Sequence, residues 1–303
     1  MMNDFDQLQA QDTVYALAAG PGGIVFAGRA SGLYRSSDGG ASWQDAYQSL
    51  KPEQALVTTA VVIAADGSVF AGVNGGVLRS SDGGFAWFAA SLGSPPPLVT
   101  ALAISPHFEV DGTMLAGTAE DGVFFSTDRG QHWISSNFRL IDLNVYSLAL
   151  SPDFARDQTA LVGTETGLFR STNGGRAWRS IPFPDEAGPV LSLAISPNFA
   201  RDGRVFAGTE SAGLFTSTDR GDTWAQIAAD NLTRAVNQMA FAGERLWLLL
   251  DDDLLRSDDL GASWQSATPP AADGPMWMAL TVLPGERGHV LVGSGSGDIL
   301  RAG

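Results

Sequence analysis

The chain has 303 residues, of which 44% are hydrophobic and 17% are charged, so it can bury a core and does not have the composition of a disordered protein. Its 33 acidic and 18 basic residues give a formal net charge of −15, which repels phosphate backbones and anionic lipid surfaces, so we expect no nucleic-acid partner. No stretch approaches the roughly eighteen apolar residues of a membrane span, so we expect no membrane insertion. The absence of cysteine excludes disulfide bonds, thiolate metal ligands and a cysteine nucleophile.

One pattern recurs six times along the chain. Its first copy reads Gly-Leu-Tyr-Arg-Ser-Ser-Asp-Gly-Gly-Ala-Ser-Trp and ends at Trp43. The acidic position is occupied in turn by Asp38, Asp82, Asp128, Asn173, Asp219 and Asp259, and the aromatic position by Trp43, Trp87, Trp133, Trp178, Trp224 and Trp264. Successive copies lie 44, 46, 45, 46 and 40 residues apart, which indicates an architecture of repeated modules.

Each module contains four short segments that alternate with the two-residue period of β-strands, separated by turns rich in Gly, Pro, Ser and Asp. Four short antiparallel strands make one blade of a β-propeller. The modules predict a single domain with blades near 13–47, 57–90, 98–136, 145–181, 190–228, 236–267 and 277–303.

The seventh module has three strand-like segments, at 277–283, 289–294 and 298–301, but no fourth. Residues 3–9 precede the first blade, and we expect them to supply the missing outer strand and to close the ring. The predicted fold is therefore an all-β, seven-bladed propeller of four antiparallel strands per blade, closed by the N-terminal strand.

The signature Ser-x-Asp-x-Gly-x-x-Trp resembles the Asp-box, or bacterial-neuraminidase-type repeat, of sialidases, sortilin-like receptors and photosystem II assembly factors. The resemblance covers nearly the whole chain and implies the propeller fold. It does not imply one function, because this turn occurs in propellers with unrelated roles. The size and the single ring look like those of the photosystem II stability and assembly factors, which implies a non-catalytic scaffold that binds a protein or peptide.

The repeated residues have a structural explanation. An aspartate at this position accepts hydrogen bonds from backbone N–H groups just ahead of it, and Asn173 still accepts through its carbonyl oxygen. We expect the tryptophans to pack each blade against its neighbour, and stacking of sugars on exposed indoles is the alternative.

A second motif, Ser-Pro-x-Phe with a following aspartate, occurs in three loops, at Asp111, Asp157 and Asp202. One carboxylate per loop is too few for calcium, which takes about six to eight oxygen ligands. We expect no metal and no cofactor.

The candidate binding site is an acidic arc. In a propeller, the loops between second and third strands lie on the face opposite the repeated turns, and loops on a rigid scaffold usually carry function. In chain order these loops contain Arg29, then Glu120, Asp121, Glu165, Glu210, Asp251, Asp252, Asp253 and Asp298. The arc predicts docking of a basic peptide or protein segment, and a solvated polar face is the structural alternative.

Trp277 lies outside the repeated turns, at the start of a first strand near the channel mouth. Two interpretations stay open for it: a partly exposed ring that contacts a cation or a sugar, or burial between blades.

Catalysis has weaker support. Sialidases use an arginine triad and a tyrosine nucleophile, but no Arg-Ile-Pro stretch precedes the repeated turns of this chain, so we expect no sialidase activity. A pair of carboxylates among Glu120, Glu165, Glu210 and Asp252 could serve a glycoside hydrolase, so a glycan-binding or glycan-cleaving protein is the alternative function. The N-terminus lacks the basic start and apolar core of a signal peptide, from which we expect a cytoplasmic protein. The sequence leaves the oligomeric state open, with a monomer favoured.

Overall fold

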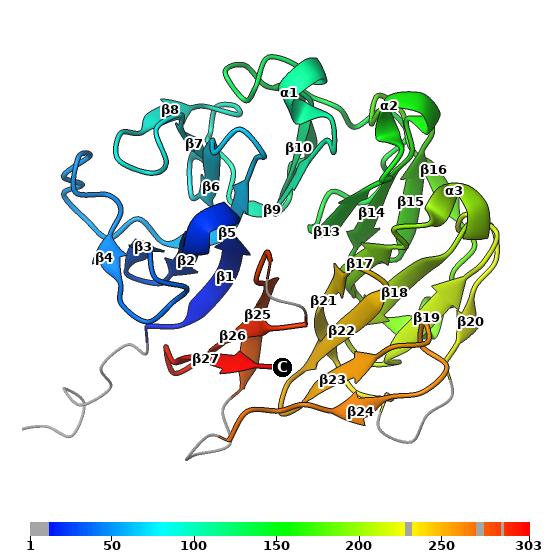
Figure 1. The fold of residues 1–303 in the computed structure, drawn as a ribbon. Helices are drawn as coiled ribbons and strands as arrows, with labels where there is room; N and C mark the ends of the chain where they lie inside the picture. Colours follow the sequence, from blue (N-terminus) through cyan, green and yellow to red (C-terminus); the bar gives the residue numbers. More distant parts are fainter. Residues whose placement is uncertain (1–11, 228–231, 271–275, 286–287) are drawn as a thin grey trace, which may run out of the picture.

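The computed structural model describes residues 12–227, 232–270, 276–285 and 288–303. Within these residues, seven antiparallel sheets stand around a central axis (Figure 1). Six sheets have four strands, and the sheet of blade seven has three. The prediction of a seven-bladed propeller with four antiparallel strands per blade is confirmed, whereas the closing strand predicted at residues 3–9 lies outside the described residues and stays a prediction.

The first four blades are formed by the following elements. Blade one contains β1 (Val14–Ala19), η1 (Pro21–Gly23), β2 (Val25–Arg29), β3 (Gly32–Ser36) and β4 (Gln44–Asp45). Blade two contains β5 (Thr58–Ile63), β6 (Val69–Val73), β7 (Gly76–Ser80) and β8 (Phe88–Ala90). Blade three contains β9 (Val99–Ile104), α1 (Phe108–Asp111), β10 (Met114–Thr118), β11 (Gly122–Ser126) and β12 (Ile134–Ser135). Blade four contains β13 (Val145–Leu150), α2 (Phe154–Asp157), β14 (Ala160–Thr164), β15 (Leu168–Ser171) and β16 (Arg179–Ile181).

The last three blades follow the same order. After η2 (Asp185–Ala187), blade five contains β17 (Val190–Ile195), α3 (Phe199–Asp202), β18 (Val205–Thr209), β19 (Leu214–Ser217) and β20 (Ala225–Gln226). Blade six contains β21 (Val236–Ala242), β22 (Arg245–Leu250), β23 (Leu254–Ser257) and β24 (Gln265–Ser266). Blade seven contains β25 (Trp277–Val282), β26 (Val290–Ser294) and β27 (Ile299–Ala302).

The outer strands are short. In blade five β20 begins one residue after Trp224, and the tryptophan belongs to the preceding turn. The predicted Ser-Pro loops contain one helical turn each, α1, α2 and α3, and the Phe at the start of each is buried, at 2, 5 and 1% exposure. The three rings belong to the hydrophobic clusters between the blades.

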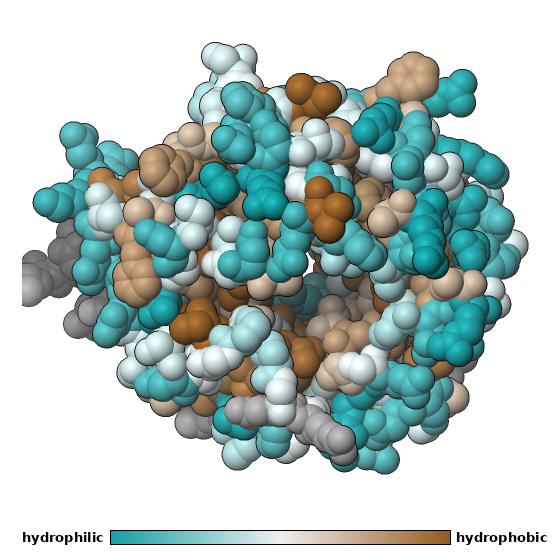
Figure 2. All heavy atoms as spheres, turned by 45° about the horizontal axis from the view of Figure 1, so that its top comes forward, coloured by the Kyte–Doolittle hydropathy of each residue, from teal (hydrophilic) through white to brown (hydrophobic). Residues whose placement is uncertain are grey.

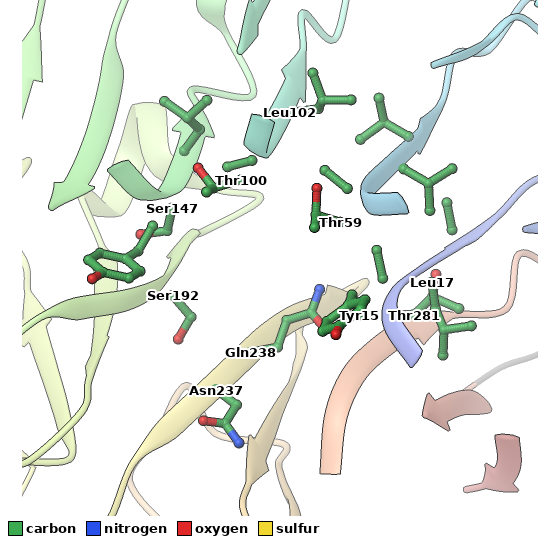
Figure 3. Close-up of a pocket in the computed structure, with 18 of the residues that line it drawn as sticks. Tyr15, Leu17, Thr59, Thr100, Leu102, Ser147, Ser192, Asn237, Gln238 and Thr281 are labelled. Carbon is green, nitrogen blue, oxygen red and sulfur yellow. The ribbon is translucent and has the colours of Figure 1, made fainter. Parts of the chain in front are cut away.

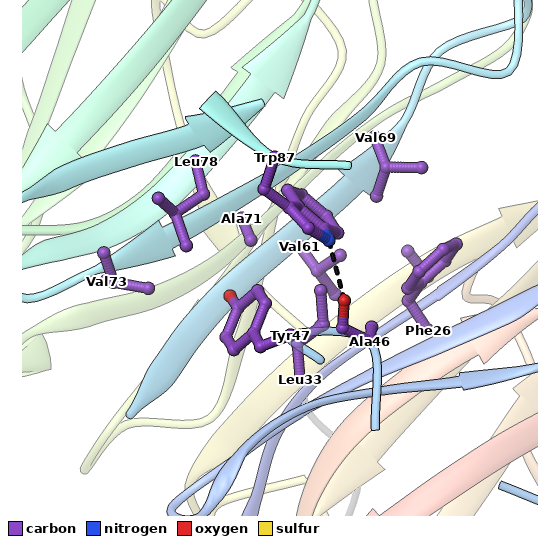
Figure 4. Packing of buried hydrophobic residues seen from close by; sticks show 11 residues of the cluster. Phe26, Leu33, Ala46, Tyr47, Val61, Val69, Ala71, Val73, Leu78 and Trp87 are labelled. Carbon is purple, nitrogen blue, oxygen red and sulfur yellow. Dashed lines mark hydrogen bonds between the residues drawn. The ribbon is translucent and has the colours of Figure 1, made fainter. Parts of the chain in front are cut away.

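The core is divided among the spaces between neighbouring blades. The tryptophan of each repeated turn packs on the blade before its own, as Trp87 of blade two does on Phe26 and Tyr47 of blade one (Figure 4). The rings of Tyr47 and Trp87 meet edge to face with centroids 5.5 Å apart, and Trp87 Nε1 donates to Ala46 O at 2.9 Å. Such contacts join the blades into one ring.

Glycines on the second strands allow the blades to approach closely. A Cβ added to Gly117 of β10 would lie 2.4 Å from Val145 Cγ1 of the next blade, well inside van der Waals contact. Blade six has Leu249 at the equivalent position, and Trp277 replaces the valine of the facing blade. The junction between blades six and seven therefore packs differently from the others.

Backbone hydrogen bonds define the two faces. In blade three, Arg129 N of the repeated turn donates to Gly112 O of the loop between β9 and β10, at 3.0 Å, and blade five repeats this bond between Arg220 N and Gly203 O, at 2.9 Å. The repeated turns and the loops between first and second strands thus share one face, as predicted. The loops of the acidic arc lie on the other face.

Candidate functional site

The repeated turns use their polar groups internally. In blade one, Asp38 Oδ1 accepts from Ser36 Oγ at 2.7 Å and from Ser42 N at 2.9 Å, while Oδ2 accepts from Ser42 Oγ at 2.6 Å. These bonds, led by that from the Ser42 hydroxyl, lower the pKa of Asp38 to about 2. In blade four, Asn173 Oδ1 accepts from Ala177 N at 2.9 Å, so the turn survives without the charge. The groups of these turns hold the loop rather than face a ligand.

The central channel contains a cavity of about 510 Å³ that is lined by the first strands of all seven blades (Figure 3). None of the lining residues carries a charged side chain, although the chain as a whole is strongly acidic. Figure 2 shows one face of the ring, hollowed at its centre, with hydrophobic and hydrophilic residues around the opening. The cavity therefore has a neutral wall.

A β-bulge in each first strand determines which side chains reach this wall. The pairing register shifts between the first and third residues of every first strand, as between Val145 and Ser147 of β13. A bulge re-aims the side chain of its extra residue. As a result two consecutive residues, here Tyr146 and Ser147, both line the channel, while Val145 stays buried between the blades.

Many polar side chains of the wall bind the neighbouring blade. They donate to the carbonyl oxygen of the first residue in the next first strand: Thr59 Oγ1 to Val99 O, Thr100 Oγ1 to Val145 O at 2.6 Å, Ser147 Oγ to Val190 O at 3.0 Å, Ser192 Oγ to Val236 O at 2.8 Å, and Asn237 Nδ2 to Trp277 O at 2.8 Å. We call these bonds the inter-blade latches. Their hydroxyl and amide groups have structural partners and are not free for a ligand.

Two tyrosines at the wall differ from these groups. Tyr15 and Tyr146 are the bulge residues of blades one and four, they are 38% and 41% exposed, and neither hydroxyl has a hydrogen-bond partner among the described residues. Burial raises the pKa of Tyr146, and the negative charges of Glu165, Glu210 and Asp142 raise it further. The arc carboxylate of Glu165 is bonded to Asn144, two residues before Tyr146.

The structure separates the arc into free and engaged side chains. Glu120, Asp121 and Glu210 are exposed, and within the described part of the chain their carboxylates have no hydrogen bond or ion pair. Glu165 Oε2 accepts from Asn144 Nδ2 at 2.7 Å, and the Asn144 Oδ1 accepts from Glu120 N at 3.1 Å. Asn144 thus links the loops of blades three and four.

The remaining members of the arc hold their own loops. Asp251 accepts from Asn237 Nδ2 at 2.9 Å, Asp252 pairs with Arg234, Asp253 accepts from Ser266 Oγ at 2.8 Å, and Asp298 accepts from Ser296 Oγ at 2.9 Å. Arg29 pairs with Asp12 at 3.2 Å and donates to Gly297 O at 3.1 Å. These contacts give most of the blade-six carboxylates a local structural role.

The interpretation of Trp277 as a partly exposed ligand contact is wrong. Its side chain has 0% exposure and lies with Trp247 in the cluster between blades six and seven. As the first residue of β25, it occupies the buried position that Val145 and Val190 occupy in their blades. It offers no ring surface to a ligand.

Sequence reasoning missed Tyr146 and Asp142. Asp142 is 9% exposed and accepts from Thr166 Oγ1 at 2.7 Å and from Asn144 N at 3.0 Å. Burial acts to raise the pKa of Asp142, but these hydrogen bonds outweigh it and hold the pKa below its ordinary value. The position of Tyr146 one residue after a buried valine was the available signal, because Tyr15 follows Val14 in the same way.

Among the described residues, no group of three or more His, Asp or Glu side chains is arranged to hold a metal ion. In the same part of the chain, no helix is long and apolar enough to cross a membrane.

No protein-family model matches the sequence, and no curated protein matches it. Solved structures do match. The extracellular domain of the putative one-component system BT4673 from B. thetaiotaomicron superposes with a TM-score of 0.75 at 18% identity, over 98% of this chain and 39% of that one. YCF48 bound to D1 peptide gives 0.73 at 17% identity, over 98% and 93% of the two chains. An ancestral GH74 enzyme gives 0.72 at 18% identity, over 96% and 45%.

What these structures share with this chain is the seven-bladed propeller. Identities this low show the fold alone, and the neighbours differ in kind: the extracellular domain of a putative one-component system, a protein bound to a peptide and a GH74 enzyme. The chain spans 39% of the length of the BT4673 chain and 45% of the GH74 enzyme, but nearly all of YCF48.

Proposed function

We propose that the protein is a non-catalytic propeller scaffold, and that it binds a basic protein or peptide segment on the face opposite the repeated turns. The observation that carries the proposal is Tyr146, an exposed ring at the channel wall, two residues after Asn144, which is hydrogen-bonded to the exposed Glu165 carboxylate at 2.7 Å. An aromatic face attracts a cation through its quadrupole, and neighbouring carboxylates add charge-assisted hydrogen bonds. A lysine or arginine side chain meets both requirements.

The surrounding charge supports a basic partner. Glu120 and Asp121 project unpaired from the second-to-third loop of blade three, and Glu210 does so from that of blade five, among the described residues. The chain has a formal net charge of −15. Charges of one sign at an exposed rim raise association rates with an oppositely charged partner, and salt screens the effect. Binding should therefore weaken as ionic strength rises.

Preorganisation also supports the proposal. Glu165 is held by Asn144, whose backbone N–H donates to Asp142, which in turn accepts from Thr166. A carboxylate fixed in this way loses less conformational entropy when it binds a ligand. Among the similar structures, YCF48 is bound to a peptide, so a propeller of this size can carry one.

The test is fluorescence anisotropy with a labelled synthetic peptide of alternating arginine and glycine, at low and moderate salt. We expect Glu165→Gln/Glu210→Gln and Tyr146→Ala each to weaken binding about tenfold or more, in the range of cation–π and charge-pair contacts. The matched control is Glu109→Gln/Glu244→Gln, which removes the same charge from two exposed positions in first-to-second loops of the other face. Equal losses in the two charge variants would show that only net charge matters and would contradict a site at Tyr146.

A second assay tests the non-catalytic part of the proposal. A panel of soluble polysaccharides is incubated with the protein, and reducing ends are measured. Turnover that Glu165→Gln or Glu210→Gln abolishes would replace the scaffold by a carboxylate-pair glycoside hydrolase.

A further inference from the structure

Exposed apolar side chains gather on one side of the same channel mouth. Met276, Val57 and Leu98 are 58, 38 and 36% exposed, and each stands directly before a first strand, β25, β5 and β9 respectively. Tyr15, 38% exposed, is the bulge residue of the blade between them. We call these four residues the apolar sector; they come from the neighbouring blades seven, one, two and three.

The equivalent positions on the opposite side of the ring are different. The residues directly before β13, β17 and β21 are Asn144, Pro189 and Ala235, and all three are half-buried. This side carries Tyr146 at the channel wall, and Glu165 and Glu210 in the second-to-third loops of blades four and five. The mouth therefore has an apolar sector on blades seven to three and an acidic side that begins with Glu120 and Asp121 on blade three, beside Leu98, and continues over blades four and five.

The apolar sector is held on a fixed backbone. Leu98 forms a β-bridge with Asn74 and accepts from Ala119 N at 3.0 Å, and Met276 O accepts from Gly295 N at 2.8 Å. These main-chain bonds hold the residues in place, so their side chains remain exposed to water in the absence of a partner. Covering them would gain roughly 25 cal/mol for each Å² of apolar surface removed from water. Exposed apolar side chains that gather on one side of a channel mouth favour an interaction site.

We propose that the apolar sector binds an apolar side chain of the same partner segment whose basic side chain contacts Tyr146, so that the recognised partner is an amphipathic segment. This inference rests on the proposed function. Tyr15 and Tyr146 line one cavity, whose wall between them is uncharged and largely bonded through the inter-blade latches. The segment accordingly has a basic end, an uncharged middle and an apolar end.

The negative charge of the mouth favours a basic, partly apolar polypeptide segment over a second copy of this chain or an anionic lipid surface. A second copy of the chain would bring another formal charge of −15 to the acidic side of the mouth. An anionic lipid surface would meet the same repulsion. A basic and apolar polypeptide segment complements both halves of the mouth at once.

The probes are synthetic peptides of three kinds, measured by titration calorimetry against the full chain. The amphipathic peptide has two arginines, an uncharged Gly-Ser spacer of two, four or six residues, and two leucines. The basic peptide has serines in place of the leucines, and the apolar peptide has glutamines in place of the arginines. We expect the best amphipathic peptide to bind about tenfold more tightly than the basic peptide of the same spacer.

The variant Met276→Ser/Val57→Ser/Leu98→Ser should remove this tenfold difference and leave the affinity for the basic peptide unchanged. The control Val110→Ser/Phe85→Ser changes two residues that are 88 and 65% exposed and belong to the face of the repeated turns, and it should preserve the difference. Melting temperatures of both variants verify that they fold.

The outcomes separate the inference from the proposed function. Equal affinities for amphipathic and basic peptides at every spacer, or a difference that persists in the triple variant, would overturn the apolar sector and leave the basic site standing. Failure of the basic peptide to bind, or binding unaffected by Tyr146→Ala, would overturn the proposed function. An apolar peptide that binds as tightly as the amphipathic one would overturn the shared segment.

Discussion

Replacing Trp178 by alanine tests whether the indoles of the repeated turns hold the ring together. The side chain is 1% exposed, and its Nε1 donates to Ser136 O of the preceding blade at 2.7 Å. Burying an indole removes about 150–250 Å² from water, which at roughly 25 cal/mol/Å² corresponds to about 4–6 kcal/mol. Alanine keeps part of this area while a cavity and an unpaired carbonyl remain, so we expect a loss of about 4 kcal/mol, within the range for large-to-small core changes.

The free energy of unfolding is measured by urea denaturation, and the melting temperature by calorimetry. With an unfolding entropy of about 2.1 cal/mol/K per residue over 303 residues, 4 kcal/mol corresponds to a decrease of about 6 °C. Trp224 is the matched comparison: it holds the same place in its turn but is half-buried, and its Nε1 donates within its own turn, to Gly221 O at 3.2 Å. Trp224→Ala should cost clearly less. A loss below about 1 kcal/mol for Trp178→Ala, or equal losses at the two sites, would refute the packing argument.

Three further predictions concern the turns and the last blade. Hydrogen bonds from the Thr223 hydroxyl, the Thr223 backbone N–H and Ser217 lower the pKa of Asp219 to about 2, so this carboxylate stabilises the fold above about pH 4 and the contribution disappears as the pH falls toward 2. The melting temperature of Asp219→Asn should therefore decrease less over that interval than that of the unchanged protein, and equal decreases in the two proteins would contradict this. Ser217→Ala removes the hydroxyl that accepts from the buried Gly221 N–H at 2.8 Å, so it should lower the free energy of unfolding by about 1–3 kcal/mol, measured by urea denaturation. Replacing an exposed serine by alanine should leave that free energy nearly unchanged. Deletion of residues 3–9 should lower the melting temperature and speed amide exchange in β27, whereas unchanged exchange would place the closing strand elsewhere.

The repeat made most of the fold predictable from the sequence. Because the turn requires an aspartate, a glycine with positive φ and a tryptophan, the same residue types recur in every copy of the repeat. Gly40, Gly84 and Gly130 do have φ of 93, 93 and 74°. The spacing then gives the number of blades and the face on which each loop lies. The three single-turn helices were not predictable from amphipathic periodicity, because one turn is too short to show it.

The candidate site was less predictable because alternation fails at the bulges. Strict alternation from Val145 places Tyr146 and Ser147 on opposite sides of the sheet, whereas the bulge turns both toward the channel. The sequence also showed where the acidic loops are, but not which side chains pair with their carboxylates. It could not show that Asp252 and Asp253 are engaged while Glu210 is free.

The inter-blade latches give a physical reason for the exposed ring in blade four. In blades two, three and six the bulge residue itself makes the latch, through Thr59, Thr100 and Asn237. In blade four the next residue, Ser147, makes it instead, which releases the bulge position for Tyr146.

Stability and binding should therefore separate at these adjacent residues. Ser147→Ala removes a buried hydrogen bond to Val190 O and should lower the free energy of unfolding by about 1–3 kcal/mol while peptide affinity is retained. Tyr146→Ala should weaken peptide binding and leave the free energy of unfolding nearly unchanged, because its ring is 41% exposed and its hydroxyl has no hydrogen-bond partner in the described part of the chain. Urea denaturation and anisotropy on the two variants make the comparison. If Ser147→Ala weakened peptide binding as much as Tyr146→Ala, the latch and the binding position would not be independent, and the division of roles between them would be wrong.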